Sequence, residues 1–364
     1  MTLAGVAAVA RQEFTVRIRK GRWRWLLGAW FLVLLALTAL LRESVLRAGR
    51  GVQPFRGAVM YGGLMLIVLS MALLVAPALT AQSVNGDRER GTLATLQVTR
   101  LSPLEIMLGK FGAAWGTMLV FLALTAPLVL WCVANGGVDA MSVVVVSVVM
   151  AVLLGTVCAV SLGLSSVLSR TTTSGVLSYL VVFALTIGTL VVFGLSSIAT
   201  QETVTRPCAV EPPPPSAVEG QPAQVPDDCS FTTTRVRTDR TWLILAANPF
   251  VVLADAAPHR ERCDDRTPQP ASGAVRGPDV EPVEYCDNGL DPLGGIGRTV
   301  RDLRKPHVPE QPMTSSYLPP PARGKAVWPT GLTVNLVLGL GMLAVTVRQL
   351  RTPYRELPRG QRVA

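Results

Sequence analysis

Long runs of apolar residues divide the chain of 364 residues. About 20 consecutive apolar residues are enough to cross the hydrocarbon core of a membrane as one helix. Six runs reach this length, and we name them spans one to six: Trp23 or Trp25 to Leu41, then 58–81, 111–134, 141–168, 175–199 and 328–347. Six such runs in one chain predict an all-α polytopic membrane protein with six transmembrane helices.

The first run must be distinguished from a cleaved signal peptide. It is longer than the apolar region of such a peptide, and it ends Leu41-Arg42-Glu43 without a small-residue cleavage pattern. We therefore expect it to remain in the protein as span one.

Residues 1–22 precede span one and have a helical pattern of their own. Apolar residues recur near helical spacing at Leu3, Val6, Ala7, Ala10, Phe14 and Ile18, with Arg11, Arg17, Arg19 and Lys20 among them. This pattern predicts a basic amphipathic helix on the membrane surface. Such a helix is either a simple anchor or a lever that touches a partner, and the pattern favours neither.

A shorter apolar stretch, 242–257, is broken by Asn248-Pro249. It is too short for a full span, and a seventh crossing would move the Arg-rich C-terminus to the other side. We expect an interfacial or re-entrant helix that packs against the spans from outside. Asp255 and His259 near its end would permit an acid–base pair, but ordinary surface positions are favoured.

Charged residues are sparse and unevenly placed. They make up 16% of the chain, against about a quarter in a soluble domain, and the mean hydropathy is +0.41. With the N-terminus inside, the inner segments hold 16 basic and five acidic residues, whereas 201–325 holds 14 basic and 17 acidic. This asymmetry predicts a plasma-membrane protein with cytoplasmic N- and C-termini, although Arg42, Arg47, Arg50 and Arg56 in the first outer loop run against it. The net charge of +10 is then a topology signal, and no nucleic-acid partner is expected.

The segment 201–327, between spans five and six, is rich in Pro and is expected to be a large extracytoplasmic loop region. It holds four of the six cysteines: Cys208, Cys229, Cys263 and Cys286. An even number of cysteines in a loop-rich exterior segment predicts two disulfides. Three pairings are possible, and we favour the sequential one because it closes the shortest loops. Cys132 and Cys158 lie in spans and are interpreted as small apolar residues.

The loop 82–110, between spans two and three, carries the most specific pattern. Thr92 suits the N-cap of a helix that presents Leu93 and Leu96 on one side. Ser102 suits the next N-cap, with Pro103 at the first helical position and Glu105 three residues after the cap. Lys110 marks the cytosolic edge of span three. Short capped helices at a membrane surface suit a rigid mechanical contact, or they merely order a tight connection.

This loop resembles that of type-2 ABC transporter permeases, which runs roughly Glu-x-Gly-Thr-Leu-Glu-x-Leu-Leu-x-Thr-Pro, then Glu-Ile and Gly-Lys. The matching residues are Glu89, Gly91, Thr92, Leu93, Leu96, Thr99, Glu105, Ile106, Gly109 and Lys110, whereas Ala94, Gln97 and Arg100 depart from the pattern. In that family the loop includes the coupling helix, which docks into a groove of the ATPase subunit. The basic N-terminal helix, the six spans with both ends inside and the large segment before span six also agree with the family.

The resemblance implies the permease subunit of an ABC exporter. Its partners would be an ABC ATPase subunit, which holds ATP and Mg²⁺, and a second permease subunit, either the same or a different chain. The chain itself is expected to have no catalytic residues, metal or cofactor. It lacks a Gly-x-x-x-x-Gly-Lys-Ser/Thr phosphate loop, because Gly109-Lys110 is followed by Phe111 and Gly324-Lys325 by Ala326. The expected layout is a helix at 1–22, spans and coupling loop at 23–200, the exterior segment, a span at 328–347 and a basic cytosolic tail at 348–364.

The apolar character of the spans bears on the cargo. The interiors of spans two to six contain no Asp, Glu, Lys, Arg or His, which disfavours an ion-driven carrier. A hydrophobic or amphipathic cargo, lipid or drug-like, fits better, and membrane lipid is an expected partner. Small and hydroxyl residues of span four either line a path or, as we favour, pack helices closely: Gly155, Thr156, Ser161, Gly163, Ser165 and Ser166.

Two points stay open at this level. The alternative function is a membrane scaffold or sensor that acts through the exterior segment 201–327 and needs no ATPase. The high content of Ala, Val, Arg and Pro is typical of high-GC bacteria and suggests a bacterial source.

Overall fold

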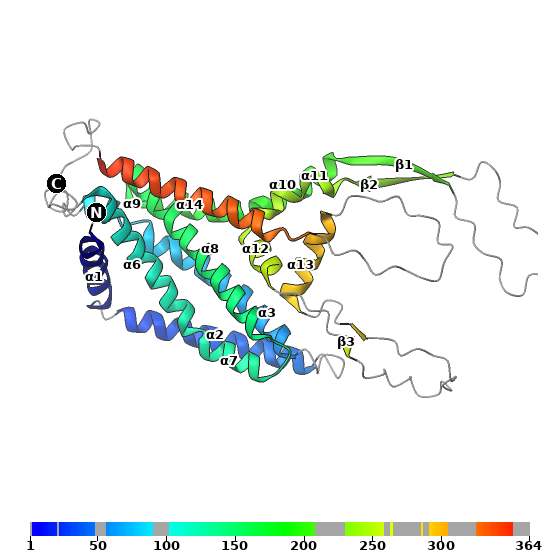
Figure 1. The fold of residues 1–364 in the computed structure, drawn as a ribbon, viewed down its shortest axis with the longest axis horizontal. Coiled ribbons are helices and arrows are strands. Elements are labelled where there is room, and N and C mark those ends of the chain that lie inside the picture. Colours follow the sequence, from blue (N-terminus) through cyan, green and yellow to red (C-terminus); the bar gives the residue numbers. More distant parts are fainter. Residues whose placement is uncertain are drawn as a thin grey trace, which may run out of the picture.

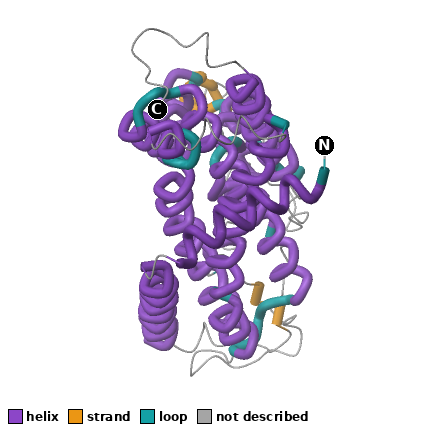
Figure 2. The backbone as a smooth tube through the Cα atoms, turned by 90° about the vertical axis from the view of Figure 1, so that its left-hand side faces the viewer, coloured by secondary structure: helices purple, strands orange, loops and turns teal. Residues whose placement is uncertain are grey.

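The computed structural model describes residues 2–19, 22–47, 56–89, 102–207, 230–257, 263–264, 285–286, 291–304 and 325–351. Within these ranges, six helical stretches are long and apolar enough to cross a membrane. Each contains one of the six predicted spans or nearly all of it. The fold class is therefore confirmed as an all-α polytopic membrane protein, and helices make up nearly all of the described chain (Figure 2).

The spans are built from the following elements. Span one is α2 (Arg22–Arg47), and span two is α3 (Arg56–Thr80), which α4 (Asn85–Glu89) follows after a turn. Span three is α6 (Pro103–Leu124) with α7 (Ala126–Ala134), and span four is α8 (Ala140–Val167). Span five is α9 (Thr171–Phe183), the π-helix η2 (Ala184–Gly188) and α10 (Thr189–Ala199), and span six is α14 (Trp328–Arg351).

Two spans are interrupted where the apolar pattern predicted single helices. Span three breaks at Thr125 because Pro127 has no N–H to continue the hydrogen-bond ladder of α6. Span three also begins at Pro103, eight residues before the predicted start, so its first two turns carry the charged residues of the loop. Span five changes to π-helical geometry at its centre, a feature that is common at functional sites.

Span four packs closely through its small residues, as favoured from the sequence. A Cβ added at Gly163 would lie 2.8 Å from Met342 Cβ, and one at Gly155 would lie 3.1 Å from the Trp115 indole nitrogen. Gly339 in span six meets Thr156 in the same way. Close approach of helix backbones is the use that membrane helices make of such residues. Gly155 and Gly163 therefore serve close packing between helices of this chain.

The spans differ sharply in how far they are buried. In the most apolar stretch of each span, 61% of the residues are buried in span four and 56% in span two, but only 17% in span one and 6% in span five. Spans one and five thus present apolar faces that no described part of the chain covers. Lipid or another subunit must cover these faces in a membrane.

The two ends of the bundle carry different structures (Figure 1). Helix α1 (Leu3–Arg19) and the C-terminal end of α14 lie at one end, which we name the α1 end. Strands β1 (Gln201–Pro207) and β2 (Ser230–Val236) project from the opposite end, which we name the hairpin end. The two strands pair antiparallel from Gln201 opposite Val236 to Pro207 opposite Ser230.

The segment 201–327 contributes further elements at the hairpin end. They are α11 (Thr238–Ala246), α12 (Pro249–Ala256), α13 (Pro292–Leu303) and the short strands β3 (Cys263–Asp264) and β4 (Tyr285–Cys286). The stretch 242–257 is thus two helices that meet at the predicted break, Asn248-Pro249. Helix α12 is buried from Val251 to Ala256, and part of it belongs to the same core as α3 and α8.

Candidate functional site

The loop between spans two and three leads into α6 through a capping box. The Glu105 amide donates to Ser102 Oγ at 3.3 Å, and the Ser102 amide donates to Glu105 Oε2 at 2.8 Å. Pro103 occupies the first turn. The pairing satisfies amide groups that the start of a helix leaves without intrahelical partners. The cap predicted from the sequence is confirmed.

Glu105 has a second task that the sequence did not indicate. Its other carboxylate oxygen, Oε1, accepts hydrogen bonds from the Thr2 amide at 2.5 Å and from Thr2 Oγ1 at 3.0 Å. The Glu105 side chain is buried as a result. One carboxylate therefore caps α6 and also fixes the beginning of α1.

Gly109 explains how α1 approaches α6 closely enough for this contact. A Cβ at Gly109 would lie 2.5 Å from Val9 Cβ and 3.1 Å from the Val6 carbonyl oxygen. Real Cβ atoms do not come so near, so any larger residue would push α1 away. The face of α1 that meets α6 includes Gly5 and Val9, whereas Leu3 and Ala7 of the predicted apolar face are exposed. The predicted helix is confirmed; its buried side is shifted toward Gly5 and Val9, while Val6, Ala10 and Phe14 of the predicted apolar face are half-buried.

Lys110 is the electrostatic centre of this region. Its side chain is 1% exposed, and its ammonium donates to Glu13 Oε1 at 2.6 Å, to the Ser83 carbonyl oxygen at 3.0 Å and to Asp87. An ammonium has three N–H donors, and each finds an acceptor here. A buried charge is tolerated only when it is paired in this way. The prediction that Lys110 marks the cytosolic edge of span three stays a prediction, but the sequence did not indicate that Glu13 and Asp87 bury its side chain.

We name the contacts of Thr2, Val9, Glu13, Asp87, Glu105, Gly109 and Lys110 the junction. It joins α1, α4 and α6 at the α1 end of the bundle. Two of its acids, Glu13 and Asp87, were missed from the sequence. The position of Lys110 in the first turns of an apolar span does indicate that acidic partners are needed. The sequence does not show which acids these are, because they lie far from Lys110 along the chain.

The opposite side of α4 contacts the connection between spans four and five. The amides of Val84 and Asn85 both donate to Ser165 Oγ at 3.2 Å. The Arg88 guanidinium donates to the carbonyl oxygens of Leu168 and Ser166, at 3.4 and 3.5 Å. These carbonyls belong to the last turn of α8, where a cation also complements the helix dipole.

Glu89 completes this side of α4. Its carboxylate accepts from the Thr171 amide at 3.3 Å, at the start of α9. Helix α4 thus meets both the end of α8 and the start of α9, while Asp87 on its other side meets Lys110. Three consecutive residues, 87–89, connect the loop directly to α6, α8 and α9, and through Lys110 to α1.

The remaining sequence-predicted residues are placed as follows. Ile106 is buried in a small core with Val84, Leu162, Val347 and Leu350. Gly91, Thr92, Leu93, Leu96 and Thr99 lie outside the described residues, as do Cys208 and Cys229. The backbones of β3 and β4 pair with Cys263 opposite Cys286. This register is compatible with the favoured pairing, and the disulfides stay a prediction.

Asp255 at the hairpin end is not the surface residue that the sequence suggested. It is fully buried, and Arg301 Nε of α13 donates to its Oδ1 at 2.5 Å. The amides of Val327 and Trp328, at the start of span six, donate to its Oδ2 at 2.6 and 2.7 Å. The carboxylate is fully occupied as a structural tie between α12, α13 and α14. His259 lies outside the described residues.

Comparison with known families agrees with this architecture. The family described as ABC-2 family transporter protein matches residues 7–265. The chain belongs to this family, whose members are membrane subunits of transporters and work in general with an ABC ATPase. The matched range includes every junction residue except Thr2, and it ends before α13 and α14. The comparison with curated proteins found no match.

Proposed function

We propose that the protein is the permease subunit of an ABC exporter, which moves a hydrophobic or amphipathic cargo, lipid or drug-like, out of the cell. ATP and Mg²⁺ are held by a separate ATPase subunit. The observation that carries the proposal is the position of α4 between two sets of contacts, to Lys110 on one side and to the α8–α9 connection on the other. The ATPase docks on the residues that follow α4.

In this proposal the α1 end is cytoplasmic, in keeping with its excess of basic residues. ATP binding moves the coupling segment, and α4 moves with it because it directly precedes that segment. Asp87 passes the movement through Lys110 to α1 and α6. Arg88 and Glu89 pass it to the end of span four and the start of span five. The junction acts as a rigid transmission because its charges are buried and paired.

A second permease subunit covers the exposed faces of spans one and five. Large apolar side chains of span five, including Val176, Leu190 and Leu195, are more than half exposed. A Cβ at Gly175 or Gly194 would meet nothing within 4 Å, so a helix backbone can approach there. The cargo path then lies between two subunits, because the small residues of span four are used in packing within one.

Purification of the chain from its native membrane in mild detergent, followed by mass spectrometry, tests the proposal. We expect a stoichiometric soluble protein with a phosphate loop, and ATPase activity in the complex. The complex is then placed in proteoliposomes with a fluorescent phospholipid and, separately, a hydrophobic dye as cargo probes. A chain that purifies alone, or with exterior proteins only, would contradict the proposal and favour a scaffold or sensor that acts through 201–327.

Charge reversal at α4 tests the route of transmission. Glu89→Arg is expected to reduce transport of the probe at least tenfold while ATP hydrolysis continues, because the Thr171 contact is replaced by repulsion between a cation and an N–H donor. Glu43→Arg is the matched control, since Glu43 is 54% exposed at the far end of span one. Unchanged transport in Glu89→Arg would remove Glu89 from the route.

A further inference from the structure

The π-helical centre of span five is bonded to a side chain from the segment 201–327. Asn248 Nδ2 donates to the carbonyl oxygen of Thr186 at 2.7 Å and to Thr189 Oγ1 at 2.9 Å. Asn248 is 2% exposed. A π-turn breaks the regular ladder of an α-helix, so a donor from another element has a clear use there. Asn248 supplies this donor from the break between α11 and α12.

The side-chain oxygen of Asn248 fixes the start of α12, directly after the break between α11 and α12. Asn248 Oδ1 accepts from the Phe250 amide at 2.9 Å and so caps α12, and Pro249 occupies the first helical position. Asparagine is one of the best N-cap residues. Because one side chain makes both contacts, the start of α12 is held at a set position on η2.

The break is also attached to span six. Asn335 Nδ2 donates to the Ala247 carbonyl oxygen at 3.1 Å. A Cβ at Gly331 would lie 2.0 Å from the Ala246 carbonyl oxygen, so only glycine lets span six come this close. Two consecutive residues at the break thus bond to different spans: Ala247 to span six and Asn248 to span five.

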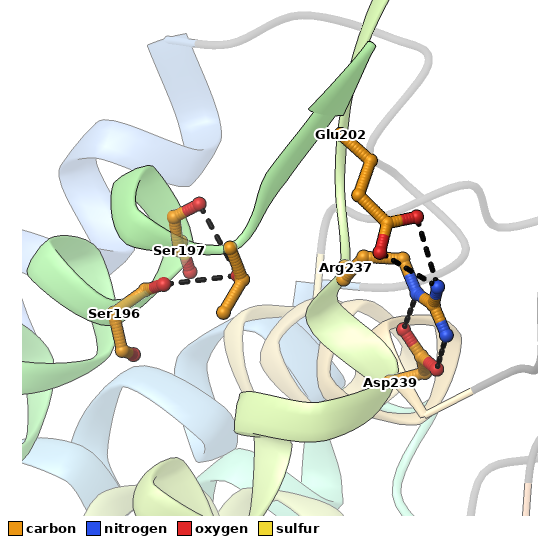
Figure 3. Close-up of polar contacts among 6 residues, drawn as sticks. Ser196, Ser197, Glu202, Arg237 and Asp239 are labelled. Atoms are coloured by element: carbon orange, nitrogen blue, oxygen red, sulfur yellow. Dashed lines mark hydrogen bonds and ion pairs between the residues drawn. The ribbon is translucent and has the colours of Figure 1, made fainter. Parts of the chain in front are cut away.

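Polar side-chain contacts also hold the two outer ends of the pair α11–α12, the start of α11 and the end of α12. At the start of α11, Arg237 Nη1 donates to both carboxylate oxygens of Glu202 in β1, at 2.9 and 3.0 Å. Arg237 Nε and Nη2 donate to the two carboxylate oxygens of Asp239 in α11, at 3.2 and 3.3 Å (Figure 3). The hydrogen bonds from Arg237 hold the pKa of Asp239 below its ordinary value. At the end of α12, Asp255 is tied to α13 and to the start of span six.

From these contacts we infer that α11 and α12 form a brace between spans five and six, with Asn248 as its joint. The brace couples the hairpin ends of both spans, and Asn248 stabilises the π-helical turn η2 against local opening. The α11–α12 part of the segment 201–327 is therefore integrated into the helix bundle through contacts with both spans. Its role in transport rests on the proposed function, whereas the joint is a property of the chain alone.

Hydrogen exchange followed by mass spectrometry, on the purified chain in lipid nanodiscs, tests the joint without an ATPase. Asn248→Ser keeps an N-cap oxygen for Phe250 but is too short to reach Thr186. We expect exchange over 184–193 to be about tenfold faster, the usual effect of losing a buried hydrogen bond that limits local opening, while α8 is unchanged. Unchanged exchange over 184–193, or an equal increase in α8, would overturn the inference.

Two matched substitutions in span five test the same contact if Asn248→Ser fails to fold. Thr189→Val removes one acceptor of Asn248, so exchange over 184–193 should rise severalfold. Thr186→Val leaves the Asn248 contact intact, because Asn248 uses the Thr186 carbonyl and the Thr186 hydroxyl bonds only within its own helix. Equal effects of the two variants would show that Asn248 is not the joint.

The transport assay separates this inference from the proposed function. If the wild-type complex transports the phospholipid or dye probe, Asn248→Ser should lower transport at least fivefold with ATP hydrolysis retained, and undiminished transport would refute the brace as a working part. If the wild type shows neither ATPase partner nor transport, the proposed function fails, and the exchange experiment still decides on the joint.

Discussion

Spans four and five are of similar length and both are strongly apolar, yet they occupy opposite environments. In their most apolar stretches, 61% of the residues of span four are buried and 6% of those of span five. Both contain glycines and hydroxyl residues. In span four Gly163 meets Met342, whereas in span five Gly194 meets nothing within 4 Å. Hydropathy thus identifies helices that cross a membrane, but the neighbours of a helix depend on the surfaces of other elements.

The largest effect should come from filling a glycine of span four. Gly163→Leu places side-chain atoms against the Met342 backbone, where a Cβ alone would lie 3.0 Å from the carbonyl oxygen. We expect a loss of about 3 kcal/mol in stability, at the upper end for overpacking, measured by denaturant unfolding in detergent. Gly194→Leu is the control in span five and should leave the stability of the isolated subunit unchanged. Equal losses would remove the contrast between the spans.

A smaller effect is expected from buried hydroxyls within span four. Ser165→Ala leaves the amides of Val84 and Asn85 without their acceptor, at a cost of about 1–2 kcal/mol. Ser161→Ala is a matched control, because the Ser161 hydroxyl is equally buried and has no hydrogen-bond partner among the described residues. Its stability should stay within about 0.5 kcal/mol of the wild type. A loss in Ser161→Ala as large as in Ser165→Ala would contradict the role of Ser165.

The smallest effect on stability should come from the exposed face of span five. Leu195 is 63% exposed, so Leu195→Ala should change the stability of the isolated subunit by no more than about 0.5 kcal/mol. If a second subunit covers this face, the variant should instead weaken subunit association, measured by cross-linking in the membrane. If the variant folds stably and subunit association is unchanged, lipid and not a second subunit covers the face at Leu195.

The features predictable from the sequence are those set by neighbouring residues. The six spans follow from apolar runs, and the capping box at Ser102 and Glu105 follows from residue types three positions apart. The break at Asn248-Pro249 also appears where proline interrupts the apolar stretch. In each case the cause and the structure lie within one or two helical turns.

The features that the sequence did not reveal depend on residues far apart in the chain. Lys110 is buried because Glu13 and Asp87 come from two other helices. Asp255 is buried because its polar atoms accept four hydrogen bonds. Two come from the Arg301 guanidinium of α13, and two come from the Val327 and Trp328 amides at the start of span six. The apolar spacing of α1 indicated only part of its buried side: Phe14 lies against Gly116 of α6, whereas Gly5 and Glu13 on that side are not large apolar residues. Burial of polar groups is decided by partners, and partners are not adjacent in sequence.

The distance in sequence across the junction has a consequence for biosynthesis. Thr2 and Glu105 are 103 positions apart, and Glu13 and Lys110 are 97 apart. Helix α1 is therefore synthesised before its partners, and it makes these contacts only after they have followed. It can dock only when spans one to three have been inserted with Lys110 on the same side as α1. An inverted third span would leave both Glu13 and Lys110 without their contact, so the docking of α1 depends on the orientation of that span.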